Sequence, residues 1–408
     1  MVTELRVYTG DGLLQAKDLP DIGNSAADAP YRPASYADMS AAIAALDAPT
    51  DANYVPWTFG NTDLETVFAS LSDNDILVLP ERPEPYLINS SNGFMAAGVK
   101  EIDGTDATGK KDGSRIPIVS NSRLWFSMTR ARRGIIGLGP GVIIEPSASS
   151  FSQGKQPILQ NEPAGQQFQL RYMTDGSSAQ MVGAAMKLME SAVANPFFAN
   201  FTIRGRDFGG VAYSALSMDG TGKKTIKRVY FDGASRGHEG VPNAETGGIS
   251  ILNGTYLIEN CDFRSQSGTS PVMWNRTKGG QVRNARSTRP DYGMWTFWKS
   301  GGLNTFENVW MVCNRTGLNL EENDADFELD WANGKMQLES TSNKFHFGIN
   351  PSGGSIKIRL HNVECSPNGW TPNAVCMNVY STSGVQRRAD VSSDGLPVSH
   401  LPSAYWIN

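Results

Sequence analysis

A short phrase built around an asparagine recurs between residues 199 and 365, and it restricts the fold more than any other feature of the chain. An apolar residue precedes the asparagine by two positions, and apolar residues follow it by one and three positions. The clear copies are Ala-Asn-Phe-Thr-Ile at 199–203, Ile-Glu-Asn-Cys-Asp-Phe at 258–263, Phe-Glu-Asn-Val-Trp-Met at 306–311 and Leu-His-Asn-Val-Glu-Cys at 360–365, with degenerate copies at 226–231 and 282–287. The reference positions 200, 228, 260, 284, 308 and 362 are 24 to 32 residues apart, except for a last interval of 54. A period of roughly 20–50 residues marks a solenoid.

The pattern within each copy predicts two strands joined by a sharp bend. Around Asn260, the residues Ile258, Cys261 and Phe263 should face inward, so the inward–outward alternation of a strand skips one step at the asparagine. Asparagine tolerates the left-handed backbone that such a bend requires. In stacked copies the amides would form a ladder of Asn200, Asn260, Asn284, Asn308 and Asn362.

A second strand precedes each bend, at 248–251, 293–296, 317–320 and 374–377. Each repeat therefore carries at least two strands with turns between them, and we expect three faces. The predicted class is all-β, a parallel β-helix with three-faced coils of about 24–32 residues.

The start of the chain does not follow the repeat. Residues 1–56 hold several prolines and a helical pattern at 35–46, which predicts a small N-terminal attachment module and linker. The capping-box sequence at 62–65 predicts a helix that covers the first end of the solenoid. A buried strand at 75–80 follows this helix.

The predicted β-helix then spans residues 57–380. A short helix is expected at 184–193 and a long loop at 146–180. Residues 381–408 lose the pattern and are expected to form a C-terminal cap or an inter-subunit segment.

Three of these features together resemble a known family. The helix before Ile-Leu-Val-Leu-Pro at 76–80, the Ile-Ile-Gly-Leu-Gly-Pro-Gly sequence at 135–141 and the asparagine repeats resemble the pectin-lyase-like right-handed parallel β-helices, over roughly residues 60–380. Within that superfamily the chain looks most like tailspikes and minor tail proteins of phages. The resemblance implies a homotrimer that binds, and in some members cleaves, surface polysaccharide. No catalytic motif of a named enzyme family is matched.

Charge and hydropathy exclude two further classes. The net charge of −5 provides no basic surface for nucleic acid. The first residues lack the basic start and apolar segment of a secretion signal, and no run of about 18 apolar residues is present. We therefore expect no membrane insertion. With the resemblance, the expected location is a virion assembled in the host cytoplasm and exposed outside the cell on the particle.

Outward-facing residues of successive copies should stack into columns. One column, two positions after each reference residue, reads Thr202, Tyr230, Asp262, Arg286, Trp310 and Glu364. Aromatic rings stack on sugars and charged groups bind hydroxyls, so Tyr230, Asp262, Arg286 and Trp310 are candidate glycan-binding residues. The same composition also suits a subunit interface. Trp295 is a further candidate, because one of the two strand phases exposes it and the other buries it.

An acidic stretch at 321–330 follows a predicted strand. Crowded carboxylates raise one another's pKa, as glycosidases require, so Glu321, Glu322, Asp324 and Asp326 are candidate catalytic residues. A solvated acidic turn and a Ca²⁺ ion near Asp324 and Asp326 are the alternatives. No other cofactor is expected. The four cysteines form no CxxC pair and are predicted to be buried free thiols without a metal.

These observations leave three functional hypotheses. The first is a virion tail or tailspike protein that binds host-surface polysaccharide and contacts other tail or baseplate proteins through residues 1–56. The second is a glycoside hydrolase or polysaccharide lyase on the same fold. The third is a structural tail adaptor without glycan binding.

Overall fold

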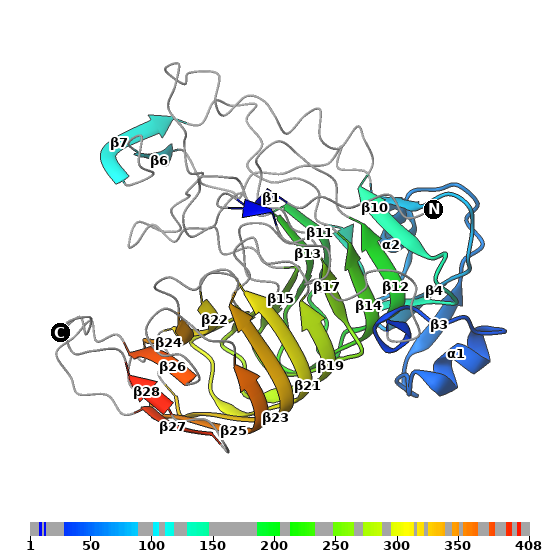
Figure 1. Ribbon diagram of the computed structural model, residues 1–408. Coiled ribbons are helices and arrows are strands. Elements are labelled where there is room, and N and C mark those ends of the chain that lie inside the picture. The colour runs from blue at the N-terminus through cyan, green and yellow to red at the C-terminus, as the bar shows by residue number, and fades with distance from the viewer. Residues whose placement is uncertain are drawn as a thin grey trace.

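The structure of the protein is a computed structural model in which most of the described residues lie in β-strands (Figure 1). It describes residues 8–9, 12–13, 28–88, 101–105, 111–117, 129–146, 186–204, 213–232, 248–264, 272–287, 295–313, 316–321, 325–338, 345–350, 354–365, 375–379, 389–393 and 398–400.

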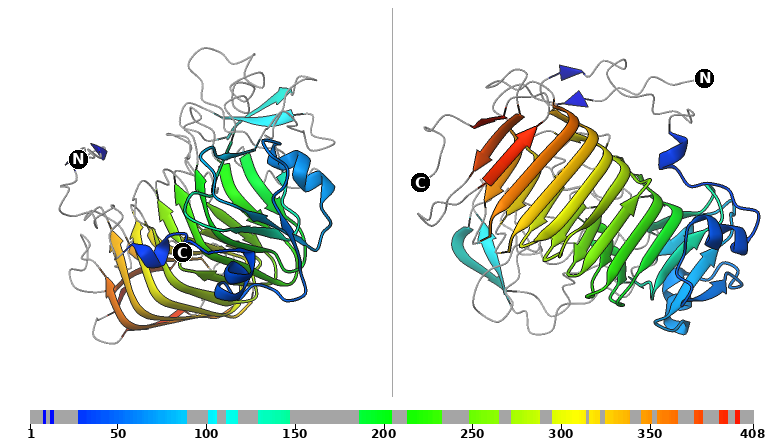
Figure 2. Two further views of the ribbon diagram at one scale, coloured as in Figure 1. Left: turned by 90° about the vertical axis from the view of Figure 1, so that its right-hand side faces the viewer. Right: turned by 90° about the horizontal axis from the view of Figure 1, so that it is seen from below.

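Two large sheets of parallel strands form the body of the molecule. The path of the 14-stranded sheet is β3 (Asn53–Pro56), β4 (Asp75–Leu79), β9 (Gly134–Gly137), β12 (Phe197–Arg204), β14 (Lys223–Asp232), β16 (Thr255–Glu259), β19 (Gly280–Ser287), β21 (Gly302–Cys313), β23 (Phe327–Leu338), β25 (Ile356–Cys365) and β27 (Ala389–Ser393). Beside this path lie β5 (Tyr86–Ile88), β10 (Ile143–Pro146) and β17 (Asp262–Arg264). Figure 2 shows these strands side by side in chain order.

The 10-stranded sheet consists of β8 (Thr129–Arg130), β11 (Met186–Ser191), β13 (Tyr213–Met218), β15 (Ile249–Leu252), β18 (Val272–Asn275), β20 (Trp295–Trp298), β22 (Thr316–Glu321), β24 (Phe345–Asn350), β26 (Val375–Val379) and β28 (Val398–His400). From β11 onward the chain alternates between the two sheets, except that the short β17 follows β16 in the same sheet. Strands that pair with each other in this part of the chain are therefore never consecutive in sequence. Parallel neighbours require such a crossover. Antiparallel pairs in the described part of the chain are β1 (Tyr8–Thr9) with β2 (Gly12–Leu13) and β6 (Glu101–Thr105) with β7 (Lys111–Pro117).

The predicted bend at each reference position is confirmed. Positive φ angles occur at Asn200, Arg228, Asn260, Asn284, Asn308, Asn333 and Asn362. Amide hydrogen bonds link Asn284 to Asn260 at 3.1 Å and Asn308 to Asn284 at 3.0 Å. The same bond links Asn362 to Asn333 at 2.9 Å. Asn333 is the reference residue of a further copy, between positions 308 and 362. The sequence pattern does not reveal this copy, because Gly334 follows the asparagine where the other copies have an apolar residue.

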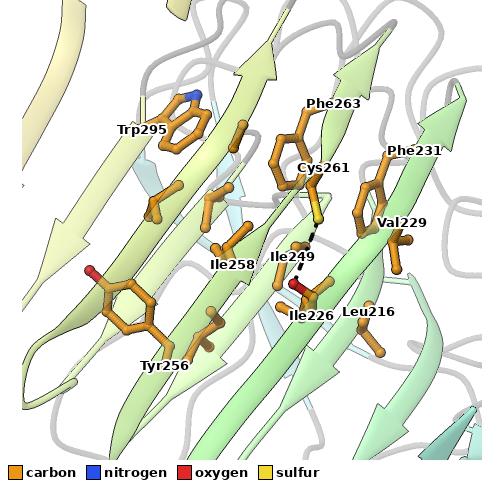
Figure 3. Packing of buried hydrophobic residues seen from close by; sticks show 14 of the residues in the cluster. Leu216, Ile226, Val229, Phe231, Ile249, Tyr256, Ile258, Cys261, Phe263 and Trp295 are labelled. Carbon is orange, nitrogen blue, oxygen red and sulfur yellow. Dashed lines mark hydrogen bonds between the residues drawn. The ribbon is translucent and has the colours of Figure 1, made fainter. Parts of the chain in front are cut away.

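Inward-facing side chains of the two sheets form one hydrophobic core, part of which is shown in Figure 3. Aromatic rings stack from strand to strand: Phe231 on Phe263 with centroids 4.8 Å apart, and Trp274 on Phe297 with centroids 4.2 Å apart. Tyr256 is buried in this core, and its hydroxyl donates to the amide oxygen of Asn304 at 2.7 Å. Stacked copies thus repeat the same packing along the molecule.

Three short helices of the described part of the chain precede the repeat: η2 (Ala29–Tyr31), α1 (Met39–Ala45) and α2 (Leu64–Ser70). The predicted helix at 62–71 is present as α2, capped by the Asp63 carboxylate, which accepts from the Thr66 N–H at 2.8 Å. Its buried side chains Leu64, Val67 and Phe68 belong to the main core. In α1, the carboxylate of Asp38 caps the helix in the same way, so this helix begins later than the predicted residue 35.

Three expectations about the ends and the middle of the chain are corrected. Residues 186–191 form strand β11 and not a helix, because pairing with β8 and β13 overrides a weak helical pattern. Strands β27 and β28 continue the two sheets within 381–408. Residues 53–56 pair with β4, so this part of the expected N-terminal module belongs to the large sheet.

The connections between the sheets differ in length from copy to copy at one edge. The chain passes from the 14-stranded to the 10-stranded sheet through residues 233–248 between β14 and β15, but through 314–315 between β21 and β22. The strands on either side keep an unbroken parallel register.

Candidate functional site

The outer face of the 14-stranded sheet presents the predicted column of polar and aromatic residues. Strand register pairs Thr202 with Tyr230, Tyr230 with Asp262, and Asp262 with Arg286. It continues from Arg286 to Trp310. Lys335, which the sequence analysis missed together with Asn333, then lies between Trp310 and Glu364. We call this row the outer column.

Residues 28–34, which we call the covering segment, lie over the first part of the outer column. The Arg286 guanidinium donates to the carboxylate of Asp262 at 2.9 and 3.1 Å and to that of Asp28 at 2.5 Å. Asp28 is 2% exposed, Asp262 1% and Arg286 5%. One cation on the sheet is therefore buried between a carboxylate of the sheet and a carboxylate of the covering segment.

Aromatic rings complete this contact in a reciprocal way. The Arg32 guanidinium of the covering segment lies 3.5 Å from the ring centroid of Tyr230. The Arg286 guanidinium of the sheet lies 4.3 Å from the ring centroid of Tyr31. Arg32 is also 3.6 Å from the Asp262 carboxylate. Each partner thus contributes one aspartate, one tyrosine and one arginine, and stacked cations of this kind are strengthened by exclusion of water.

Side chains at the asparagine bends hold the backbone of the covering segment. The amide of Asn200 accepts from the Ala34 N–H at 2.6 Å and donates to the Ala34 carbonyl at 2.8 Å. Arg228, which occupies a bend position in place of asparagine, donates to the carbonyls of Ala29 at 3.4 Å and Arg32 at 3.3 Å.

The enclosed environment shifts the pKa of two groups in the contact. Burial lowers the pKa of Arg286, but the carboxylates of Asp262 and Asp28 outweigh burial and raise it overall. Burial raises the pKa of Tyr31, and the Arg286 charge opposes this rise. Both side chains therefore keep one protonation state throughout the physiological pH range.

The structure corrects the expectation that Tyr230, Asp262 and Arg286 are open to a glycan. Their side chains leave the sheet on its outer face, as the periodicity requires, but the covering segment buries them. Trp295 lies in the core with no exposed area, in contact with Trp274 and Phe306. The other strand phase is therefore adopted, because it buries Trp295 and Phe297 together.

Beyond Arg286 the outer column continues with the half-buried Trp310, followed by Lys335 and Glu364. The Lys335 ammonium lies 6.0 Å from the ring centroid of Trp310 and 2.9 Å from the Glu364 carboxylate. The amides of Asn308, Asn333 and Asn362 lie two residues before these side chains and are exposed. An accessible aromatic ring is thus combined with a cation, a carboxylate and a row of amides.

The column one position before the bends alternates in charge over Lys227, Glu259, Arg283 and Glu307. Glu259 lies 3.6 Å from Lys227 and 3.1 Å from Arg283. Lys227 is buried under the end of α1, where it donates to the Leu46 carbonyl at 2.8 Å. This column therefore supports the attachment of residues 46–47 to the sheet.

The acidic stretch forms ordinary structural contacts where it is described. Glu321 ends β22 and its carbonyl accepts from the Lys299 N–H, while Glu322 and Asp324 lie outside the described residues. Asp326 accepts from the N–H and hydroxyl of Ser355 at 3.0 and 2.8 Å, and these bonds lower its pKa. Bonds from Arg359 likewise lower the pKa of Asp330. The expected rise from crowding is wrong for these two, because each carboxylate has its own donor.

Among the described residues, no group of three histidine, cysteine or acidic side chains is close enough to hold a metal ion. None of the described helices has the length and apolar character needed to span a membrane. Cys261, Cys313 and Cys365 are buried free thiols, as predicted, and burial raises the pKa of Cys261 to about 12. The side chain of Cys376 lies outside the described residues.

Comparison of the chain with models of protein families, with curated proteins and with solved structures finds no match.

Proposed function

We propose that the chain is a right-handed parallel β-helix of the tailspike or minor tail protein type, and that it binds a host-surface polysaccharide on a phage virion. The alternation of the chain between two parallel sheets supports the β-helix, because each coil would take one strand from each sheet. The regular bends at the asparagines support coils of constant geometry.

One observation carries the binding function: Trp310, Lys335 and Glu364 stand side by side on the part of the outer column beyond the covering segment. A half-exposed indole offers a flat apolar face to a sugar ring, and the neighbouring ammonium, carboxylate and amides offer hydrogen bonds to hydroxyls. The described acidic residues 326 and 330 support a polysaccharide hydrolase or lyase less well, because their pKa values are lowered.

We further propose that three copies of the chain form a homotrimer, and that this homotrimer is attached to other tail or baseplate proteins through residues 1–56. A column of mixed aromatic and charged residues is also typical of subunit interfaces. Glycan binding and self-association are therefore measured separately on the same protein.

The binding test uses a panel of purified bacterial surface polysaccharides and biolayer interferometry with the full chain. We expect Trp310→Ala to weaken binding at least about tenfold, equivalent to about 1.4 kcal/mol. Lys357→Ala is the matched control, since this exposed lysine lies on β25 with Glu364 but outside the outer column. Equal binding by wild type and Trp310→Ala, or binding of no polysaccharide by wild type, contradicts the proposal. Mass photometry tests assembly, and a monomer at micromolar concentration contradicts the homotrimer.

A further inference from the structure

The contact between the covering segment and the sheet has the properties of a peptide bound to a receptor. The two partners are far apart in sequence: the residue numbers of Asp28 and Arg286 differ by 258. Asn200 and Arg228 of the sheet bind the backbone of residues 28–34, whereas Asp28, Tyr31 and Arg32 contact the sheet through their own side chains. Backbone contacts accept almost any sequence, so the three side chains are the part of the segment that the sheet can recognise.

The segment is stiffened before it binds. Pro30 lies in the first turn of η2 and Pro33 follows this helix, so the backbone around Tyr31 and Arg32 has few alternative conformations. A segment fixed in its bound shape loses little conformational entropy on docking. Asp28, Tyr31 and Arg32 are thereby presented together to Arg286, Tyr230 and Asp262.

The link from this segment to α1 is held to the sheet by few contacts. Ser35, Ala37 and Asp38 are exposed, Tyr36 between them donates its N–H to the Leu138 carbonyl at 2.8 Å, and α1 begins at Met39. If a second copy supplied its own residues 28–34, the docked contacts would be the same and only the path of the link would change. Exchange of an identical element is a low-cost route to assembly between copies of one chain.

We infer that Tyr230, Asp262 and Arg286 form a recognition site for a proline-flanked Asp-x-x-Tyr-Arg segment. Residues 28–34 of the same chain fill this site, and residues 28–34 of a second copy fill it when the chain's own segment is displaced. The recognition site shares no residue with the proposed glycan-binding residues Trp310, Lys335 and Glu364, so either proposal can fail without the other.

The first test uses a fluorescein-labelled peptide of residues 26–37 and full-length protein carrying Tyr31→Ala and Arg32→Ala. These substitutions weaken the chain's own segment and leave the recognition site intact. We expect the peptide to bind this variant and to bind wild type at least about tenfold more weakly, because the occupied site is rarely available. Adding Arg286→Ala to the variant should abolish binding. A peptide with Asp28→Asn and Arg32→Ala is the matched control.

The second test concerns the second copy. Full-length protein with Arg286→Ala keeps an intact segment but lacks the recognition site, so it should be retained by the tagged Tyr31→Ala, Arg32→Ala protein. Retention should disappear when the untagged protein also carries Arg32→Ala. The single substitution Arg32→Gln replaces the double variant if circular dichroism shows the latter to be unfolded. A folded variant that does not bind the peptide, or that binds it equally well with Arg286→Ala, overturns the inference.

Discussion

Replacement of Asn284 separates the two contributions that an asparagine makes at each bend. Its φ angle is +48°, and its amide donates to Asn260 and accepts from Asn308 at 3.1 and 3.0 Å. Alanine in the left-handed region costs about 1–2 kcal/mol. Loss of two hydrogen bonds costs about 0.5–1.5 kcal/mol each. For this half-buried side chain we expect Asn284→Ala to lower the free energy of unfolding by about 2–3 kcal/mol.

Glycine distinguishes the strain from the hydrogen bonds. Asn284→Gly loses the same two hydrogen bonds but adopts positive φ without strain, so it should retain about 1 kcal/mol more stability than Asn284→Ala. Urea denaturation followed by tryptophan fluorescence measures both. The exposed Gln281 on the same strand provides the control, because Gln281→Ala should change stability by no more than about 0.5 kcal/mol. If glycine and alanine are equally destabilising, the strain argument is wrong. If both match wild type, the ladder does not stabilise the fold.

Three further predictions concern charge and packing. Arg286→Ala should lower the unfolding free energy by about 3–5 kcal/mol because it leaves two buried carboxylates without their shared cation, whereas Arg283→Ala, at a partly exposed pair, should cost about 1 kcal/mol or less. Trp274→Ala should cost about 3–5 kcal/mol in the same urea assay, through the cavity left beside Phe297. The lowered pKa of Asp330 means that its pairing with Arg359 stabilises the fold above about pH 4 and is lost as pH falls through the lowered pKa. The stability difference between wild type and Arg359→Gln should therefore shrink from pH 6 to pH 3, and an unchanged difference would contradict the assignment.

The sequence alone was sufficient to predict the register of the large sheet from β12 to β21. A two-residue alternation that skips a step at every asparagine determines which side chains face outward, and parallel stacking then places equivalent positions side by side. The outer column from Thr202 to Trp310 followed directly from this rule. The rule failed at Trp295, because both strand phases fit a short aromatic run and burial of two large rings selects one of them.

The cover over the outer column was not predictable in the same way. Orientation is a local property of a strand, but exposure depends on every other part of the chain that packs on that face. Asp28, Tyr31 and Arg32 carry no periodic pattern, and the only signal was the match of residue types between them and Tyr230, Asp262 and Arg286. The candidate binding residues of the outer column are therefore Trp310, Lys335 and Glu364, which follow Arg286.

The unequal connections at one edge of the sheets have a consequence for engineering. The connection at 233–248 is much longer than the connection at 314–315, yet the strands that flank each of them keep their parallel register. The length of these connections therefore does not determine how the strands are spaced. Insertions are best tolerated where few backbone hydrogen bonds depend on chain length. A tag or a small foreign domain placed between β14 and β15 should leave Trp310 in its position. The same edge thus offers a place to label the protein or to display another module.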